Sequence, residues 1–283
     1  MNTELKQLSL WLNLNRLSLN ISKTNFIIFR SNKKKTLPYN VTLKMNKKAI
    51  MEKEHIKYLG VYIDYCLNWK EHISIISKKV SRGVGIVCKL KQYLCTKSIT
   101  TIYYSLVYSH LVYGIQVWGS ACDTDLKILS TLQNKAVRIM TNNNTFRTES
   151  CALVSADPLF VELKLLKIKE IFQLEVGKFI FSSLKKNTPP IFHDWFIPNH
   201  SVHGHATVSN TNIDCEHYFA IGTVTFTNTL HTQGSNLVTY GGRQLKVAGP
   251  ILWNSLPLPM RESDTLQIFK LELKKFFLDQ YQL

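Results

Sequence analysis

The hydrophobic period of this chain changes near Trp69, and this change constrains the fold more than any other feature of the sequence. From His55 to Trp69, β-branched and aromatic residues favour an extended chain, and Gly60 marks a bulge or a close backbone approach. From His72 to Leu94, apolar residues recur every three or four positions, as in an amphipathic helix. The sequence therefore predicts a strand-containing part followed by a helical part.

The residues before Trp69 indicate a small α+β unit. Residues 3–13 fit a helix whose apolar stripe consists of Leu5, Leu8, Trp11 and Leu12. Residues 17–29 and 41–45 fit short strands separated by polar turns, and the end of the first segment is typical of a buried strand. We expect one helix and then a small antiparallel sheet.

Helical periodicity dominates the middle of the chain. A second helix is predicted from Ser98 to about Trp118, a third is capped by Asp123, and a fourth spans about 158–185. The tyrosines of the second helix could stack on nucleic-acid bases, or they could pack in the core. A last amphipathic helix begins at Ser263.

Positive charge is concentrated in the first third of the chain. Of the net charge of +16, most lies in residues 1–100, which hold 19 Lys and Arg against 5 Asp and Glu. Residues 101–283 hold 16 against 14. A polyanion, most commonly nucleic acid, is the natural partner of such a surface, although solubility alone is the other interpretation.

The cysteines and histidines form no recognisable metal motif. The six cysteines have no CxxC spacing and lie mostly in apolar patterns, so we expect reduced core residues in an intracellular protein, nuclear or cytoplasmic. The histidines of residues 193–231, with Cys215, suit zinc in type but not in spacing, and a polar loop is the other interpretation. No signal peptide or membrane-spanning run is recognisable.

Several stretches, taken in chain order, resemble one protein family. They are WLNLNRLSLNISKTNFIIF (11–29), HIKYLGVYIDYCLNWKEHI (55–73), LVYSHLVYGIQVWGSA (106–121), LQNKAVRIM (132–140) and GPILWNSLP (249–257) before an FKLELKKFF helix (269–277). Together they resemble the C-terminal part of the reverse transcriptase of jockey-like non-LTR retrotransposons. The resemblance implies the end of a palm at 1–67, a helical thumb at 68–141, and a helical and irregular tail at 142–283, with the run of asparagines at 142–144 as a linker.

The resemblance implies RNA-directed DNA synthesis on an RNA and DNA primer-template. Polymerisation uses two metal ions held by clustered carboxylates, and the family supplies them from a Tyr-x-Asp-Asp turn that is absent here. Glu52 and Glu54 lie in a lysine-rich segment and Asp64 is isolated, so we expect no metal site and no catalysis by this chain alone. It resembles a truncated or mis-bounded reading frame, and Mg²⁺ is implied only for the complete enzyme.

The resemblance also assigns roles to individual residues. Lys23 matches a general acid for the leaving pyrophosphate, although a surface turn lysine is the other interpretation. Tyr58, Leu59 and Gly60 match the primer grip, although an ordinary strand with a bulge is equally compatible. Phosphate contacts are expected from the basic residues, namely Lys33, Lys34, Lys35, Lys78, Lys79, Arg82 and Lys89.

Two alternatives remain open at this point. One is a retained protein-interaction module, for which an incomplete palm would leave an apolar face near Phe26, Ile28 and Val61. Its partner would be the missing catalytic half or another protein. The other alternative is a non-functional relic.

Overall fold

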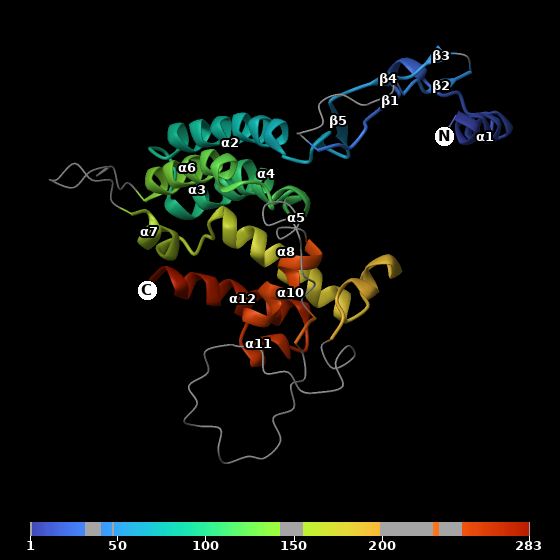
Figure 1. The fold of residues 1–283 in the computed structure, drawn as a ribbon. Helices are drawn as coiled ribbons and strands as arrows, with labels where there is room; N and C mark the ends of the chain where they lie inside the picture. The colour runs from blue at the N-terminus through green and yellow to red at the C-terminus, as the bar shows by residue number, and fades with distance from the viewer. Residues whose placement is uncertain are drawn as a thin grey trace, which may run out of the picture. The chain divides into compact units, whose positions relative to one another are not determined.

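The structure is a computed structural model that describes residues 2–31, 41–46, 48–141, 155–198, 229–231 and 245–282. It confirms an α+β fold, mainly helical with a few small sheets (Figure 1). The chain divides into two compact units, residues 1–76 and residues 77–283, and each is described by itself. The segment boundaries expected at residues 67 and 141 stay predictions.

The first unit contains a helix, a 3₁₀ turn and short paired strands. Its elements are α1 (Asn2–Leu14), a 3₁₀ turn (Ile21–Lys23), β1 (Asn25–Phe26), β2 (Lys44–Met45), β3 (Lys48–Ala49), β4 (Met51–Glu52), β5 (His55–Tyr58), β6 (Val61–Asp64) and the start of α2 (Lys70–Leu90). The pairs β2–β3 and β5–β6 are antiparallel as expected, whereas β1 pairs with β4 in parallel. The strand predicted at the end of residues 17–29 as buried is observed only at Asn25–Phe26, where it is half-buried.

The core of the first unit is small. Leu43, Met45 and Ile50 are buried, and the partly buried side chains around them include Leu5 and Leu12 of α1. The remaining apolar residues of α1 are not covered within the unit. They are Leu8, Leu10, Trp11 and Leu14, with exposed fractions between 44% and 84%. The stripe predicted through Leu8 and Trp11 is thus only half correct, because the core contacts one edge of the helix.

The second unit is built from helices. Its elements are the rest of α2, α3 (Thr96–Tyr103), a π-helical segment (Tyr104–Tyr108), α4 (Ser109–Val112), α5 (Ile115–Trp118), α6 (Asp123–Met140), α7 (Asp157–Glu162), α8 (Ile168–Leu184), a 3₁₀ segment (Pro190–Trp195), α10 (Leu245–Ser255), α11 (Leu258–Arg261), α12 (Leu266–Asp279) and a 3₁₀ turn (Gln280–Gln282). Helix α8 packs against α10 and α12. The rings of Phe181 and Phe269 stack there, with centroids 4.9 Å apart.

Two predicted helices are interrupted. The helix expected over residues 98–118 passes through the π-helical segment and then breaks at Gly114, whose φ of 63° suits a residue without Cβ. The helix expected over residues 158–185 breaks between α7 and α8, where Lys164 has a φ of 52°. Asp123 is the first helical residue of α6 and not its cap, since Cys122 holds the N-cap position.

The four described cysteines lie outside the core, contrary to the prediction. Among the described residues, Cys88 and Cys95 are exposed, and Cys66 and Cys122 are half-buried. Cys88 follows the fully buried Val87, and the ~100° turn between successive helical residues carries it away from the core. Within the described ranges, every helix is too short or too polar to cross a lipid bilayer.

Candidate nucleic-acid interface

The stretch expected to be one bulged strand is a β-hairpin. Strands β5 and β6 pair in antiparallel register, from His55 opposite Asp64 to Tyr58 opposite Val61. The two residues between the strands form the loop, so the bulge interpretation is wrong. Tyr58, Leu59 and Gly60, the three residues that match the primer grip, are thereby brought together at the tip of this hairpin, and all three are exposed.

The backbone at the hairpin tip is strained. A two-residue loop of type I′, which follows the twist of its strands, needs positive φ at both positions, and Leu59 and Gly60 have φ of 45° and 87°. Glycine adopts this conformation readily, but leucine does so at a cost of about 1–2 kcal/mol. Leu59 also leaves 74% of its surface exposed. Strain combined with an exposed apolar side chain suits a contact residue better than a packing residue.

A single carboxylate organises the loop between the hairpin and α2. Asp64 is buried, and its Oδ1 accepts hydrogen bonds from the backbone amides of Cys66 (3.1 Å) and Asn68 (3.0 Å). Its Oδ2 accepts from the backbone amide of Trp69 at 2.8 Å. Burial, together with the hydrogen bond to Asp64, raises the pKa of the Cys66 thiol. Asp64 thus holds a backbone loop and is committed to that role.

Two further contacts secure the same junction. The Asn68 side chain accepts a hydrogen bond from the backbone amide of Lys70 at 3.0 Å, which satisfies a donor at the start of α2. The buried His72 accepts from the backbone amide of Tyr62 through Nδ1 at 3.2 Å. The first turn of α2 is therefore tied to β6 within the first unit.

The described part of α2 in the second unit carries a basic outer ridge. Val80, Val84 and Val87 are buried, at 0–3% exposure. Opposite them, at ~100° of rotation per residue, four exposed positions fall within an arc of about 60°. They are Lys78, Arg82, Gly85 and Lys89, which we call the α2 ridge. The structure thus brings three of the predicted phosphate-contacting residues together.

Lys79 lies to one side of the α2 ridge. Burial and the positive charge of Lys79 lower the pKa of His110 in α4. Lys79 is itself exposed. Among the described residues, no carboxylate pairs with the basic side chains of this surface, namely Lys78, Lys79, Arg82 and Lys89. These charges therefore remain available to an external anion.

Of the other predicted lysines, only Lys23 is described, and it lies in the first unit. Lys23 ends a 3₁₀ turn whose backbone is capped by Asn20, and its side chain is exposed. This placement fits the surface turn interpretation. Lys33, Lys34 and Lys35 lie outside the described residues, as do the proposed asparagine linker and most of the histidine-rich segment.

The tyrosines of the second predicted helix divide between the two interpretations. Tyr103 is fully buried, and its hydroxyl accepts a hydrogen bond from Gln133 at 3.0 Å. Burial and the negative charge of Glu175 raise the pKa of Tyr108 to about 12. Tyr104 and Tyr113 are exposed, at 37% and 56%. Core packing accounts for the first two residues, and the other two remain open to solvent.

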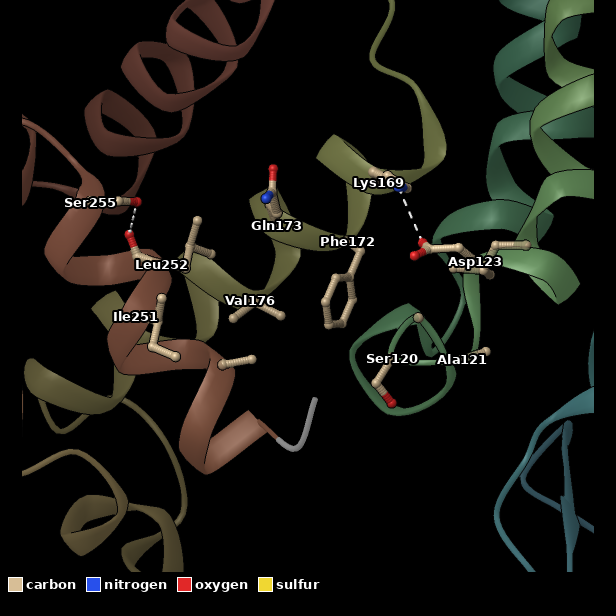
Figure 2. Close-up of a pocket in the computed structure, with 13 residues that line it drawn as sticks. Ser120, Ala121, Asp123, Lys169, Phe172, Gln173, Val176, Ile251, Leu252 and Ser255 are labelled. Atoms are coloured by element: carbon tan, nitrogen blue, oxygen red, sulfur yellow. Dashed lines mark hydrogen bonds and ion pairs between the residues drawn. The ribbon is translucent and has the colours of Figure 1, made fainter. Parts of the chain in front are cut away.

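A separate cavity of about 470 Å³ lies between α5, α6, α8 and α10 (Figure 2). Its lining is mainly apolar and includes Phe172, Val176 and Ile251. An exposed ion pair between Lys169 and Asp123, 3.1 Å apart, stands at its side. None of the predicted site residues lines this cavity. Its chemistry suits an apolar contact and not a phosphate.

The described carboxylates are not arranged as the ligands of catalytic metal ions. Within the described ranges, no three His, Cys, Asp or Glu side chains are grouped as a metal site requires. Asp64 already accepts three backbone amides. Glu52 pairs with Arg30 at 2.8 Å. Asp64 and Glu52 are therefore engaged in structural contacts.

Comparison with known proteins finds two similar transposon polymerases. No family model and no solved structure matches the chain. A probable RNA-directed DNA polymerase from transposon X-element of Drosophila melanogaster is 27% identical over 133 residues. A probable RNA-directed DNA polymerase from transposon BS of the same species is 29% identical over 115 residues. The chain is similar to transposon RNA-directed DNA polymerases.

These alignments are partial on both sides. They cover 46% and 38% of this chain, and only 14% and 12% of the two transposon polymerases. The similarity supports a reverse-transcriptase-like origin for the chain. The chain spans only a small part of the length of these polymerases.

Sequence reasoning missed two residues that shape the interface. Asp64 was interpreted as an isolated carboxylate, because its partners are backbone amides, which leave no mark in a sequence. Arg30 pairs with Glu52 and stacks over Tyr65, with 4.9 Å from its guanidinium carbon to the ring centroid, and the sequence pattern indicates neither contact. An arginine before the basic loop was the only available signal.

Proposed function

We propose that this chain contributes primer and template backbone contacts to RNA-directed DNA synthesis by a non-LTR retrotransposon polymerase, as its late palm, thumb and tail. The contacts are directed mainly at phosphates, so binding depends on salt and is poor in sequence specificity. The chain does not catalyse polymerisation by itself. Mg²⁺ belongs to the complete enzyme, whose catalytic carboxylates this chain does not supply.

The observation that carries the proposal is the α2 ridge with Lys79 beside it. These cations are exposed and lack carboxylate partners among the described residues. A cationic ridge opposite the buried valines of the same helix is more than solubility requires. The similarity to transposon polymerases supports nucleic acid as its partner.

The test is binding of the purified chain to a labelled RNA–DNA primer-template at several salt concentrations. The variant Lys78→Ala/Lys79→Ala/Arg82→Ala removes three phosphate contacts. We expect the slope of log affinity against log salt to fall by about 2–3, because each neutralised phosphate contributes ~0.7–0.9.

A matched control removes the same charge elsewhere. Lys127, Lys270 and Lys275 are exposed on α6 and α12, so Lys127→Ala/Lys270→Ala/Lys275→Ala lowers the net charge equally. The control is expected to keep the wild-type slope. Absence of binding at low salt by a folded wild-type chain would overturn the proposal, as would equal losses in the two triple variants.

A protein-interaction module is the second candidate, favoured by the exposed apolar residues of α1. Leu10, Trp11 and Leu14 leave 64%, 54% and 84% of their surfaces exposed. The face predicted from Phe26, Ile28 and Val61 is instead half-buried. Binding to the catalytic half of a polymerase that is lost in Trp11→Ala/Leu14→Ala, with no dependence on salt, would favour this candidate.

A further inference from the structure

Two glycines of α2, two residues apart, occupy opposite environments. A Cβ added to Gly83 would lie 2.6 Å from the carbonyl oxygen of Leu106, so packing against the π-helical segment requires a glycine there. In the described part of the chain, a Cβ added to Gly85 would meet no atom within 4 Å. Gly85 also has an ordinary helical backbone, so neither packing nor conformation explains its presence.

A glycine in this position has a cost. In a helix interior, glycine is less favourable than alanine by ~1 kcal/mol, because it loses more backbone freedom and covers less of the helix. Among the described residues, no contact offsets this cost at Gly85. A ligand that must approach the helix backbone closely would account for the missing side chain.

The surroundings of Gly85 specify the chemistry of that ligand. Gly85 lies between Arg82 and Lys89 on the α2 ridge, with Lys78 one turn before Arg82. Arg82 and Lys89 are seven residues apart, or ~10 Å along the axis at 1.5 Å per residue. The ridge therefore presents two cations with a gap between them, which complements a polyanionic backbone with phosphates on both sides of the gap.

We propose that Gly85 is the point of closest approach between α2 and the backbone of an RNA–DNA primer-template, with Arg82 and Lys89 holding phosphates on either side. This inference rests on the proposed function and assigns the contact to one position. A side chain at residue 85 stands between the helix and the nucleic acid. Gly85 is a positioning residue, because its absent side chain lets Arg82 and Lys89 reach their phosphates.

The experiment measures primer-template affinity and thermal stability for Gly85→Ala and Gly85→Gln. Both variants keep the net charge, and both introduce residues that favour a helix. We expect a higher melting temperature in both, with affinity reduced about threefold by alanine and tenfold or more by glutamine, since a tenfold loss needs only ~1.4 kcal/mol of displaced contacts. Ser81→Gln is the control, at an exposed position of α2 outside the ridge arc.

The outcomes separate this inference from the function on which it rests. If the wild-type chain does not bind the primer-template, the proposed function is wrong. A wild-type chain that binds through Lys78, Lys79 and Arg82, but whose Gly85→Gln variant binds equally well, overturns the inference alone. A loss of affinity in Ser81→Gln as large as in Gly85→Gln also overturns the inference, because the effect would then not be specific to position 85.

Discussion

The carboxylate of Asp64 accepts the backbone amide of Trp69 at 2.8 Å, and this bond closes the loop that joins β6 to α2. Leu67 and Trp69 have φ of 55° and 66°, so the loop does not adopt the most favourable backbone conformation by itself. The carboxylate holds it there with three backbone hydrogen bonds. The start of α2 depends on this arrangement.

Replacement of Asp64 by alanine is expected to destabilise the first unit. It leaves the amides of Cys66, Asn68 and Trp69 without their acceptor, at a combined cost of about 3 kcal/mol. Urea unfolding of the full chain measures this loss. Glu54→Ala, at an exposed carboxylate before β5, is the control and should change stability by less than about 0.5 kcal/mol. Equal midpoints for the two variants would contradict the role of Asp64.

Replacement of Leu59 by asparagine is expected to stabilise the hairpin. Asparagine tolerates positive φ better than leucine, and Asn-Gly is the favoured pair for such a loop, so we expect a gain of about 1 kcal/mol. Gly60→Ala, at φ of 87°, should destabilise the hairpin. Chemical unfolding of the two variants tests both signs. A destabilised Leu59→Asn variant would show that Leu59 is held by packing and not by the turn.

The two glycines of α2 are expected to respond to alanine in opposite directions. Gly83→Ala forces a methyl group against the Leu106 carbonyl and should cost about 2 kcal/mol. Gly85→Ala meets open space and should gain up to about 1 kcal/mol. Melting temperatures recorded side by side decide this. Two changes of the same sign would show that the packing of α2 against the π-helical segment differs from the one described.

The stability of the second unit is expected to fall at alkaline pH through Tyr108. Burial and Glu175 raise its pKa from 10 to about 12, so the folded state favours the protonated phenol. This stabilisation is complete below pH 10 and is lost as pH rises through about 12. At pH 11 the raised pKa still contributes about 1.4 kcal/mol to the free energy of unfolding, relative to an unperturbed tyrosine.

Tyr108→Phe removes this titration. Urea unfolding of wild type and variant at pH 8 and pH 11 gives the comparison, and the difference in stability between the two proteins should change by about 1.4 kcal/mol between these pH values. The direction follows from the unfolded chain, which loses its phenol proton at lower pH than the folded chain. A difference that stays constant with pH would show that Tyr108 titrates normally.

The long amphipathic helices could be predicted because their signal is repeated many times. The apolar face of α2, predicted from His72 to Leu94, is observed from Lys70 to Leu90, and its valines are buried. The last helix begins at Leu266 with Thr265 as its cap, close to the prediction at Ser263. In both cases each turn of the helix adds an apolar residue on the same face.

The hairpin could not be predicted because Leu59 is an unusual residue for its loop. Gly60 is a turn signal, but Leu59 before it is a residue that two-residue loops rarely accept. The pattern therefore indicated a continuous strand. Asp64 was concealed for a related reason, since an acidic residue after a strand has many ordinary roles. The basic residues of α2 are exposed, as the helical period predicts, and their contact with phosphates stays a prediction. The open space at Gly85 follows only from the packing around the helix.

The loop held by Asp64 also bears on how such chains diverge. A backbone amide is present at every position except proline, so the side chains at 65 and 66 can change while the same backbone hydrogen bonds form. The acceptor has no such freedom, because only a short carboxylate reaches all three amides. The carboxylate at position 64 is therefore under a tighter chemical constraint than the side chains at positions 65 and 66.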